Sequence, residues 1–258
     1  MYLKSIPVYV ITKRAPRLNW SRFSQSIVIL SLSLLLCFWP PSAFAQPNTN
    51  FDQRVLETIR QHPEVILESI QAYQQQQQQQ AQETQQALAQ DLITQPEMIV
   101  GLSPSTSPLE NRAVLLEFSD FQCPFCAEAH ETVQAFVARH PEQVTLVYKH
   151  FPLSSIHPQA LAAAKAAYAA QQQDQFWAYH DALFEHQDQM GEDFYLKTAH
   201  ILNLDLEQFN RDRAQAMDMI QKDIDLAAKL GIRGTPFFFF QGQTFSGAVP
   251  AEKFEELL

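Results

Sequence analysis

Cysteine is scarce in this sequence of 258 residues, with only three, at positions 37, 123 and 126. A zinc site built from two CxxC pairs is therefore excluded. Basic residues are also few, 18 Lys and Arg against 28 Asp and Glu, and the formal net charge is −10. This charge argues against nucleic acid as a partner, because a phosphate backbone binds basic surfaces.

The first 45 residues contain no acidic side chain but five basic ones. An apolar run from Ile27 to Trp39 has the length of a signal-peptide core and is short for a transmembrane span. Two prolines end it, and Ala43-Phe44-Ala45 then gives a small-x-small cleavage pattern. We predict a signal peptide over residues 1–45, a mature chain from Gln46 and a periplasmic or other extracytoplasmic location. An uncleaved membrane anchor is the alternative.

Cleavage removes Cys37, which we interpret as a small hydrophobic residue of the apolar run. The loss of five basic and no acidic residues takes the net charge from −10 to −15. The remaining chain is long enough for a sizeable core. It keeps two cysteines, spaced C-P-F-C at Cys123 and Cys126. A disulfide across so short a loop adds little stability, so the pair indicates redox chemistry.

Residues 46–95 are polar and helix-prone. Apolar residues recur at helical spacing from Phe51 to Tyr73, and an unbroken Gln run follows at 74–80. A coiled coil needs a sustained apolar seam, so we predict a solvated Gln-rich helical spacer. The alternative is an arm over residues 51–92 that forms a homo-oligomer.

We assign residues 96–258 to the main domain. We expect strands at 113–118 and 144–148 and a hairpin at 237–245. A short edge strand at 98–100 is expected at the entry to the domain. Helices are expected at 123–139, through most of 158–230 and at 250–258. The order β, α, β, helical block, β, β, α predicts an α/β fold with a helical insertion over about 157–230.

The CPFC pair is predicted at the start of a helix, where unpaired N–H groups and the helix dipole favour a thiolate. Pro124 suits the first helical turn because it lacks an N–H. Cys126, one turn on, lies on the same side as Cys123 and within bridging distance. We assign Cys123 as the exposed nucleophile and Cys126 as the resolving thiol.

The alternative use of a CxxC pair is as two zinc ligands. Four histidines are available to complete such a site, but none shows paired ligand spacing with another: His130, His140, His150 and His157. We therefore expect no metal and no organic cofactor. We interpret His130 as a helix-surface residue, with a contact to the redox helix as the alternative. The aromatic residues Phe176, Trp177, Tyr179 and Phe184 are expected in the core.

The segment from Glu117 to Cys126, with the letters EFSDFQCPFC, resembles the active-site strand and helix of the DsbA-like thioredoxin family, of the exported bacterial CPxC type. Three further stretches fit the same family: FPL with HP at 151–158, QFWAYHDALF at 175–184 and GTP at 234–236. The resemblance covers about residues 98–258 and leaves the N-terminal segment outside. It implies a thioredoxin-like fold with an inserted all-helical domain.

The resemblance also implies site residues. Thr235-Pro236 matches a cis-proline loop that faces the CxxC pair and presents backbone groups to a bound peptide. We therefore expect Thr235, Pro236 and Phe125 to contact substrate. Glu117 matches a buried acid that assists proton transfer to the buried thiol. On the letters alone, an ordinary trans proline and a solvated glutamate are the alternatives.

The function that follows is a thiol–disulfide oxidoreductase that donates disulfides to exported proteins. The family implies a membrane partner, either a quinone-linked oxidase or a reductase. An isomerase or reductase is the first alternative, favoured if residues 51–92 dimerise the chain. A chaperone-like peptide-binding module with an inert structural disulfide is the second alternative.

Overall fold

The structure, a computed structural model, describes residues 49–258. The predicted signal peptide, its cleavage site and Cys37 lie outside the described residues. Residues 68–258 form one compact unit, and the preceding residues belong to a separate unit. Within the described range, no helix combines the length and the apolar character that crossing a membrane requires.

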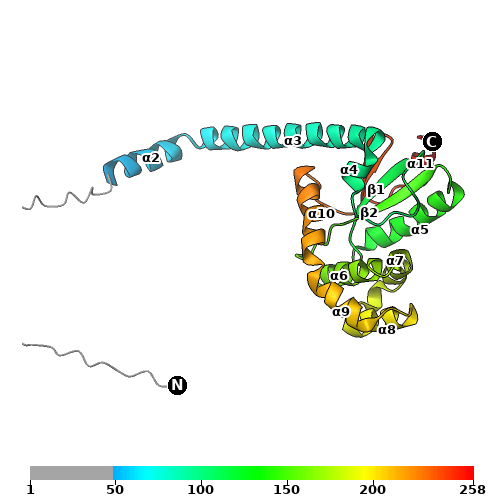
Figure 1. Cartoon of the computed structure of the whole chain (residues 1–258). Helices are drawn as coiled ribbons and strands as arrows, with labels where there is room; N and C mark the ends of the chain where they lie inside the picture. Colours follow the sequence, from blue (N-terminus) through cyan, green and yellow to red (C-terminus); the bar gives the residue numbers. More distant parts are fainter. Residues whose placement is uncertain (1–48) are drawn as a thin grey trace, which may run out of the picture. The chain divides into compact units, whose positions relative to one another are not determined.

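The elements follow the order that the sequence predicts (Figure 1). The helices and strands are α2 (Thr49–Gln61), α3 (Pro63–Thr94), α4 (Pro96–Val100), β1 (Ala113–Ser119), α5 (Pro124–Arg139), β2 (Val144–His150), α6 (Ala160–Gln171), α7 (Phe176–Glu185), the 3₁₀ helix η1 (Gln187–Gln189), α8 (Glu192–Ile201), α9 (Leu206–Gln215), α10 (Met217–Lys229), β3 (Phe237–Phe240), β4 (Gln243–Ser246) and α11 (Glu252–Glu255).

A four-stranded mixed sheet in the order β2-β1-β3-β4 lies at the centre of the larger unit. β1 and β2 pair in parallel, because α5 returns the chain between them. β3 is antiparallel to both β1 and β4. The α/β fold class with a helical insertion is confirmed, since α6–α10 all fall between β2 and β3.

The two faces of β1 have different partners, because successive side chains of a strand point to opposite faces. Val114, Leu116 and Phe118 pack in a cluster with residues of α3 and α10. Leu115 points to the other face, where it meets Val133 and Phe136 of α5. By this alternation Glu117 and Ser119 lie on the α5 face, the face that carries the cysteines.

The end of α3 belongs to the core and is not solvated. Leu88, Ala89 and Leu92 are buried against the sheet cluster, and Gln85 Nε2 donates to the carbonyl of Leu230 at 2.6 Å. The prediction of a solvated spacer over residues 46–95 therefore does not hold for residues 85–92, which pack against the main domain.

The predicted edge strand at residues 98–100 is wrong. These residues belong to the short helix α4, which begins at Pro96. The bridge to the sheet edge is made further along, between Ser105 and Val147 of β2. Pro96 favours the first turn of a helix, and this local preference outweighs the β-branched pair Ile99-Val100.

Candidate active site

Cys123 is the N-cap residue of α5, and Pro124 occupies the first helical position. The Cys123 carbonyl accepts hydrogen bonds from the backbone N–H groups of Cys126 at 3.1 Å and Ala127 at 3.2 Å. These bonds place Cys126 in the first turn, beside Cys123. Both cysteines carry free thiols in this structure.

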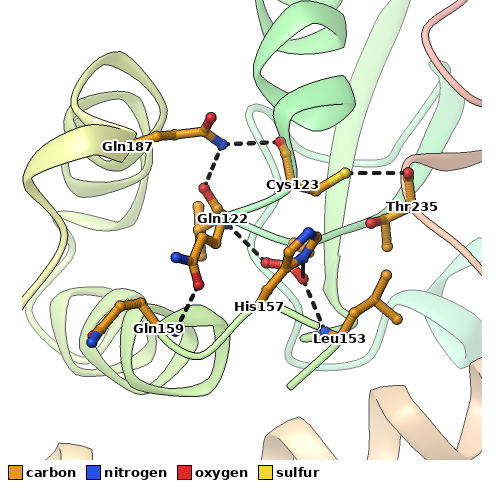
Figure 2. A network of polar contacts seen from close by, with 9 residues as sticks. Gln122, Cys123, Leu153, His157, Gln159, Gln187 and Thr235 are labelled. Carbon is orange, nitrogen blue, oxygen red and sulfur yellow. Dashed lines mark hydrogen bonds and ion pairs between the residues drawn. The ribbon is translucent and has the colours of Figure 1, made fainter. Parts of the chain in front are cut away.

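The expectation of an exposed Cys123 needs correction. Cys123 is only 4% exposed, while Cys126 is completely covered. The loop at Gly234–Pro236 covers Cys123 from the side, because its thiol donates to the carbonyl of Thr235 at 3.4 Å (Figure 2). The order of accessibility still favours Cys123 over Cys126 as the thiol that a substrate reaches.

The peptide bond between Thr235 and Pro236 is cis, as the resemblance implied. Its loop comes directly before β3, and β3 pairs with β1, which leads into the cysteine helix. Two segments more than 100 residues apart in sequence thus meet at Cys123 Sγ. The Thr235 hydroxyl is buried and has no hydrogen-bond partner among the described residues.

The two thiols ionise very differently. The pKa of Cys123 is lowered from 9.0 to about 5, mainly by the hydrogen bond from the Cys126 side chain. Burial opposes this shift, whereas Thr235 and the backbone N–H groups of Cys126 and Phe125 lower the pKa further. Burial and the neighbouring Cys123 hold the pKa of Cys126 far above the ordinary thiol value. A thiolate at Cys123 beside a thiol at Cys126 is the arrangement that disulfide exchange requires.

Glu117 is buried, 3% exposed, on the α5 face of β1. Burial raises its pKa from 4.5 to about 7, against a hydrogen bond with Ser119 that lowers it. The charge of Glu117 also acts on Cys126 and helps to raise the pKa of that thiol. The alternative of a solvated, edge-facing glutamate is therefore wrong.

A buried carboxylate that the sequence analysis did not single out organises the loops around the cysteines. Asp120 accepts from the N–H groups of Gln122 at 2.8 Å and Leu153 at 2.9 Å. Its other close partner is His157 Nδ1, at 2.7 Å. Figure 2 shows Leu153 and His157 beside the Cys123–Thr235 contact. Both Asp120 and His157 fall within the quoted motifs, but nothing in the letters pairs them.

The helical insertion also holds the cysteine turn in place. Gln187 Nε2 donates to the carbonyls of Phe121 at 2.7 Å and Cys123 at 2.9 Å (Figure 2). The side-chain oxygen of Gln122 accepts from the backbone N–H of Gln159 at 2.6 Å. Gln187 lies in a glutamine-rich stretch of ordinary appearance, so the sequence carried no signal for it.

Phe125, the second residue of the dipeptide between the cysteines, is 60% exposed. Its ring has no charge and no hydrogen-bonding group. Ile156, in the loop held by Asp120, is also exposed. The predicted contact of Phe125 with substrate stays a prediction, with which its exposure is compatible.

The prediction that His130 lies on the helix surface is wrong. His130 is 7% exposed, because α7 packs against α5 at this point. Its ring stacks on Phe184 and meets His180 edge to face. Within residues 49–258, His130, His180 and Asp181 form the single group of side chains whose ligand atoms lie close enough to hold a metal ion. The expected core position of the aromatic residues is confirmed for Phe176, Tyr179 and Phe184, whereas Trp177 is only partly buried against the same cluster.

Comparison with known proteins agrees with this geometry. The family model of the DSBA-like thioredoxin domain matches residues 114–258, and the model of the copper resistance protein ScsC N-terminal domain matches residues 49–80. A thioredoxin-like oxidoreductase from Silicibacter pomeroyi is 31% identical, with a TM-score of 0.54 over 61% of this chain and 90% of that one. ScsC from Proteus mirabilis shares the fold at 21% identity, with a TM-score of 0.54 over 81% of this chain and 94% of that one.

A curated relative, the Na(+)/H(+) antiporter NhaA 3 of Salinispora tropica, is 37% identical over 142 residues. The match covers 54% of this chain but only 22% of the antiporter. It therefore concerns one domain of that larger protein. Together with the model that matches residues 114–258, these similarities show that the chain belongs to the family of DSBA-like thioredoxin domains.

Proposed function

We propose that this chain is an extracytoplasmic thiol–disulfide oxidoreductase that oxidises the thiols of exported proteins. The observation that carries the proposal is the contrast between the two thiols. Cys123 caps α5 with its pKa lowered to about 5, whereas burial raises the pKa of Cys126. A stable thiolate is a good leaving group, so its disulfide is readily attacked and reduced.

In the oxidising direction a substrate thiolate attacks Cys123 Sγ, and the Cys123–Cys126 bond breaks. Cys126 leaves as a thiolate and takes up a proton, for which the raised pKa of about 7 makes Glu117 a suitable donor. A second substrate thiolate then attacks the substrate sulfur of the mixed disulfide and releases Cys123. Two electrons pass from the substrate dithiol to the cysteine pair, and a membrane quinone-linked partner would remove them.

Substrate would bind across Thr235, Pro236 and Phe125. The Thr235 carbonyl lies 3.4 Å from Cys123 Sγ, which is close enough for an extended peptide at this loop to reach the sulfur. The exposed ring of Phe125 offers apolar contact without selecting for charge. No organic cofactor is needed, because the cysteine pair itself carries the electrons.

Oxidised mature protein, residues 46–258, mixed with a reduced peptide that contains two thiols tests the proposal. We expect one peptide disulfide per chain and equivalent loss of the Cys123–Cys126 disulfide, measured by mass spectrometry. Failure of the peptide to oxidise while the protein disulfide survives would refute an oxidase. A control peptide with a single thiol should be oxidised much less, because the Cys126 thiol displaces it from the mixed disulfide before a second peptide arrives.

Isomerisation is the second candidate function, and a surface of the N-terminal segment favours it. Apolar side chains at helical spacing are exposed on α2, at Phe51, Val55 and Ile59, and on α3, at Ile66, Ile70 and Tyr73. A second copy of this chain would cover such an apolar face of either helix. Oligomers bring several cysteine pairs to one misfolded substrate, which suits disulfide isomerisation.

A further inference from the structure

Outside the cysteine pair, three side chains from two helices converge on one point. His130 comes from α5, while His180 and Asp181 come from α7. His180 Nδ1 lies 2.9 Å from Asp181 Oδ1, and His130 Nε2 lies 3.7 Å from the same oxygen. All the candidate ligand atoms lie within 4.8 Å of one another.

Hydrogen bonding inside the protein satisfies this group only in part, through the contact between His180 Nδ1 and Asp181 Oδ1. The 3.7 Å between His130 and Asp181 is too long for a hydrogen bond. His180 is 2% exposed, and its Nε2 has no partner among the described residues. Both rings are buried, and a neutral imidazole keeps one nitrogen lone pair that can bind a metal ion.

The surrounding charge is negative. The carboxylates of Glu131 and Glu185 act on His130 together with Asp181. The side chain of Asp181 is 35% exposed, and its Oδ1 is the atom that both rings approach. A cation that entered this site would therefore meet one carboxylate ligand, with two further carboxylates nearby.

We propose that His130, His180 and Asp181 form a binding site for a divalent transition-metal ion of borderline softness, such as Zn²⁺. Two imidazoles and one carboxylate are a common Zn²⁺ ligand set, and they leave a fourth position to water. Tetrahedral bonds of about 2.0 Å place ligand atoms about 3.3 Å apart. The two separations from Asp181 Oδ1, 2.9 Å to His180 Nδ1 and 3.7 Å to His130 Nε2, lie on either side of this value. Mg²⁺ and Ca²⁺ prefer all-oxygen sites, and Cu⁺ prefers sulfur, so this ligand set disfavours them.

The site differs from the zinc alternative considered for the sequence, because it uses neither cysteine. His130 is four residues after Cys126, so an ion here would join the cysteine helix to α7 of the helical insertion. This position connects the two parts of the domain directly behind the redox pair.

Isothermal titration of the oxidised mature protein with Zn²⁺ tests the proposal, since the Cys123–Cys126 disulfide prevents the thiols from binding metal. We expect one ion per chain. Asp181→Asn, which keeps the shape and an acceptor oxygen, should weaken binding at least ten-fold, and so should His130→Gln. His200→Gln, at an exposed histidine of α8, should bind as the wild type does.

Thermal unfolding provides a second measurement that does not depend on heats of binding. Zn²⁺ should raise the Tm of the wild type and of His200→Gln but leave the Tm of Asp181→Asn unchanged. Circular dichroism would show that each variant is folded. Absence of saturable binding to the oxidised wild type, or binding that survives either ligand substitution, would overturn the proposal.

Discussion

The thiol of Cys123 donates a hydrogen bond to the main-chain carbonyl of Thr235 at 3.4 Å. A carbonyl can only accept, so this bond exists while the thiol is protonated. Once Cys123 ionises, it needs donors, and the Thr235 hydroxyl, buried and without a partner among residues 49–258, is a candidate in addition to the Cys126 thiol and the N–H groups of the helix. The same residue can thus serve both protonation states of the nucleophile.

Replacing this hydroxyl should therefore destabilise the ionised form of Cys123 and leave its protonated form unchanged. We expect Thr235→Val to raise the pKa of Cys123 by about 1, since a hydrogen bond to a charged group contributes about 1.5 kcal/mol. Absorbance of the thiolate during a pH titration measures it. Thr235→Ser, which keeps the hydroxyl, is the control and should titrate like the wild type. Equal titration of all three proteins would show that the hydroxyl does not reach the sulfur.

The roles of the two cysteines predict opposite behaviour of their serine variants. Cys123→Ser should lose all exchange activity, because the accessible sulfur is gone. Cys126→Ser should accumulate mixed disulfides through Cys123, because the resolving thiol is missing. Non-reducing gels and mass spectrometry of trapped partners distinguish the two. Trapping by Cys123→Ser and not by Cys126→Ser would reverse the assignment.

The redox potential should be intermediate. The most strongly oxidising relatives carry a histidine between the cysteines, whereas Phe125 offers the thiolate neither charge nor a hydrogen bond. The pKa of Cys123, lowered to about 5, accordingly falls inside the activated range of about 3.5–7.5 but above its lower end. We expect a potential between about −270 mV, as in thioredoxin, and about −120 mV, as in DsbA. Equilibration with glutathione buffers measures it, and a value at the oxidising limit would contradict the argument from Phe125.

Burial of Glu117 should make stability depend on pH. Its pKa is 4.5 when unfolded and about 7 when folded, so the folded state holds the proton more tightly. This preference is present in full below pH 4.5 and is lost as the pH rises through 7. At pH 8 Glu117→Gln should be more stable than the wild type by up to about 3 kcal/mol, and at pH 4 the two should be equal.

Urea unfolding of the oxidised proteins at both pH values measures this difference. The matched control is Glu131→Gln, an exposed glutamate of α5, which should match the wild type throughout. Destabilisation by Glu117→Gln at pH 8 would mean that the carboxylate is ionised and paired in the fold.

The apolar stripe of the N-terminal segment should control association. Ile66→Lys with Ile70→Lys places two charges on the exposed stripe of α3 and should convert an oligomer into a monomer. Light scattering after gel filtration measures the mass. Gln76→Lys with Gln80→Lys adds the same charge to the same helix and should leave the mass unchanged. A wild-type mass equal to that of a single chain would contradict the proposed homo-oligomer.

Much of this fold follows from local sequence. The strand at 113–119 and the Phe237–Phe240 hairpin were predictable because their apolar runs and flanking turns act within a few residues. Residues 98–100 could not be predicted in the same way, because the β-branched pair Ile99-Val100 favours a strand while Pro96 favours the start of a helix. Local composition predicted the bounds of these strands closely. It did not predict that the end of α3 is buried against the sheet.

The candidate site divides in the same way. The role of the cysteines could be predicted from their spacing, whereas the loop at Thr235 and the burial of Glu117 were predicted only from the resemblance to a known family. Gln187 and the burial of His130 could not, because both depend on how the helical insertion packs against α5 and the cysteine turn. No pattern within either segment records that packing.

The pairing of β1 with β3 has a consequence for how the chain folds. Leu116 faces Phe239, so this pairing joins strands separated by the whole helical insertion. Contacts of such long sequence separation are late and slow to form, because the loop between them must first be closed. During synthesis Cys123 is made 112 residues before Thr235, so the cysteine helix exists before the loop that covers it. On the proposed function, a nascent chain in which Thr235 has not yet been made would present the Cys123 thiol without its cover, and a finished copy would accept it as a substrate.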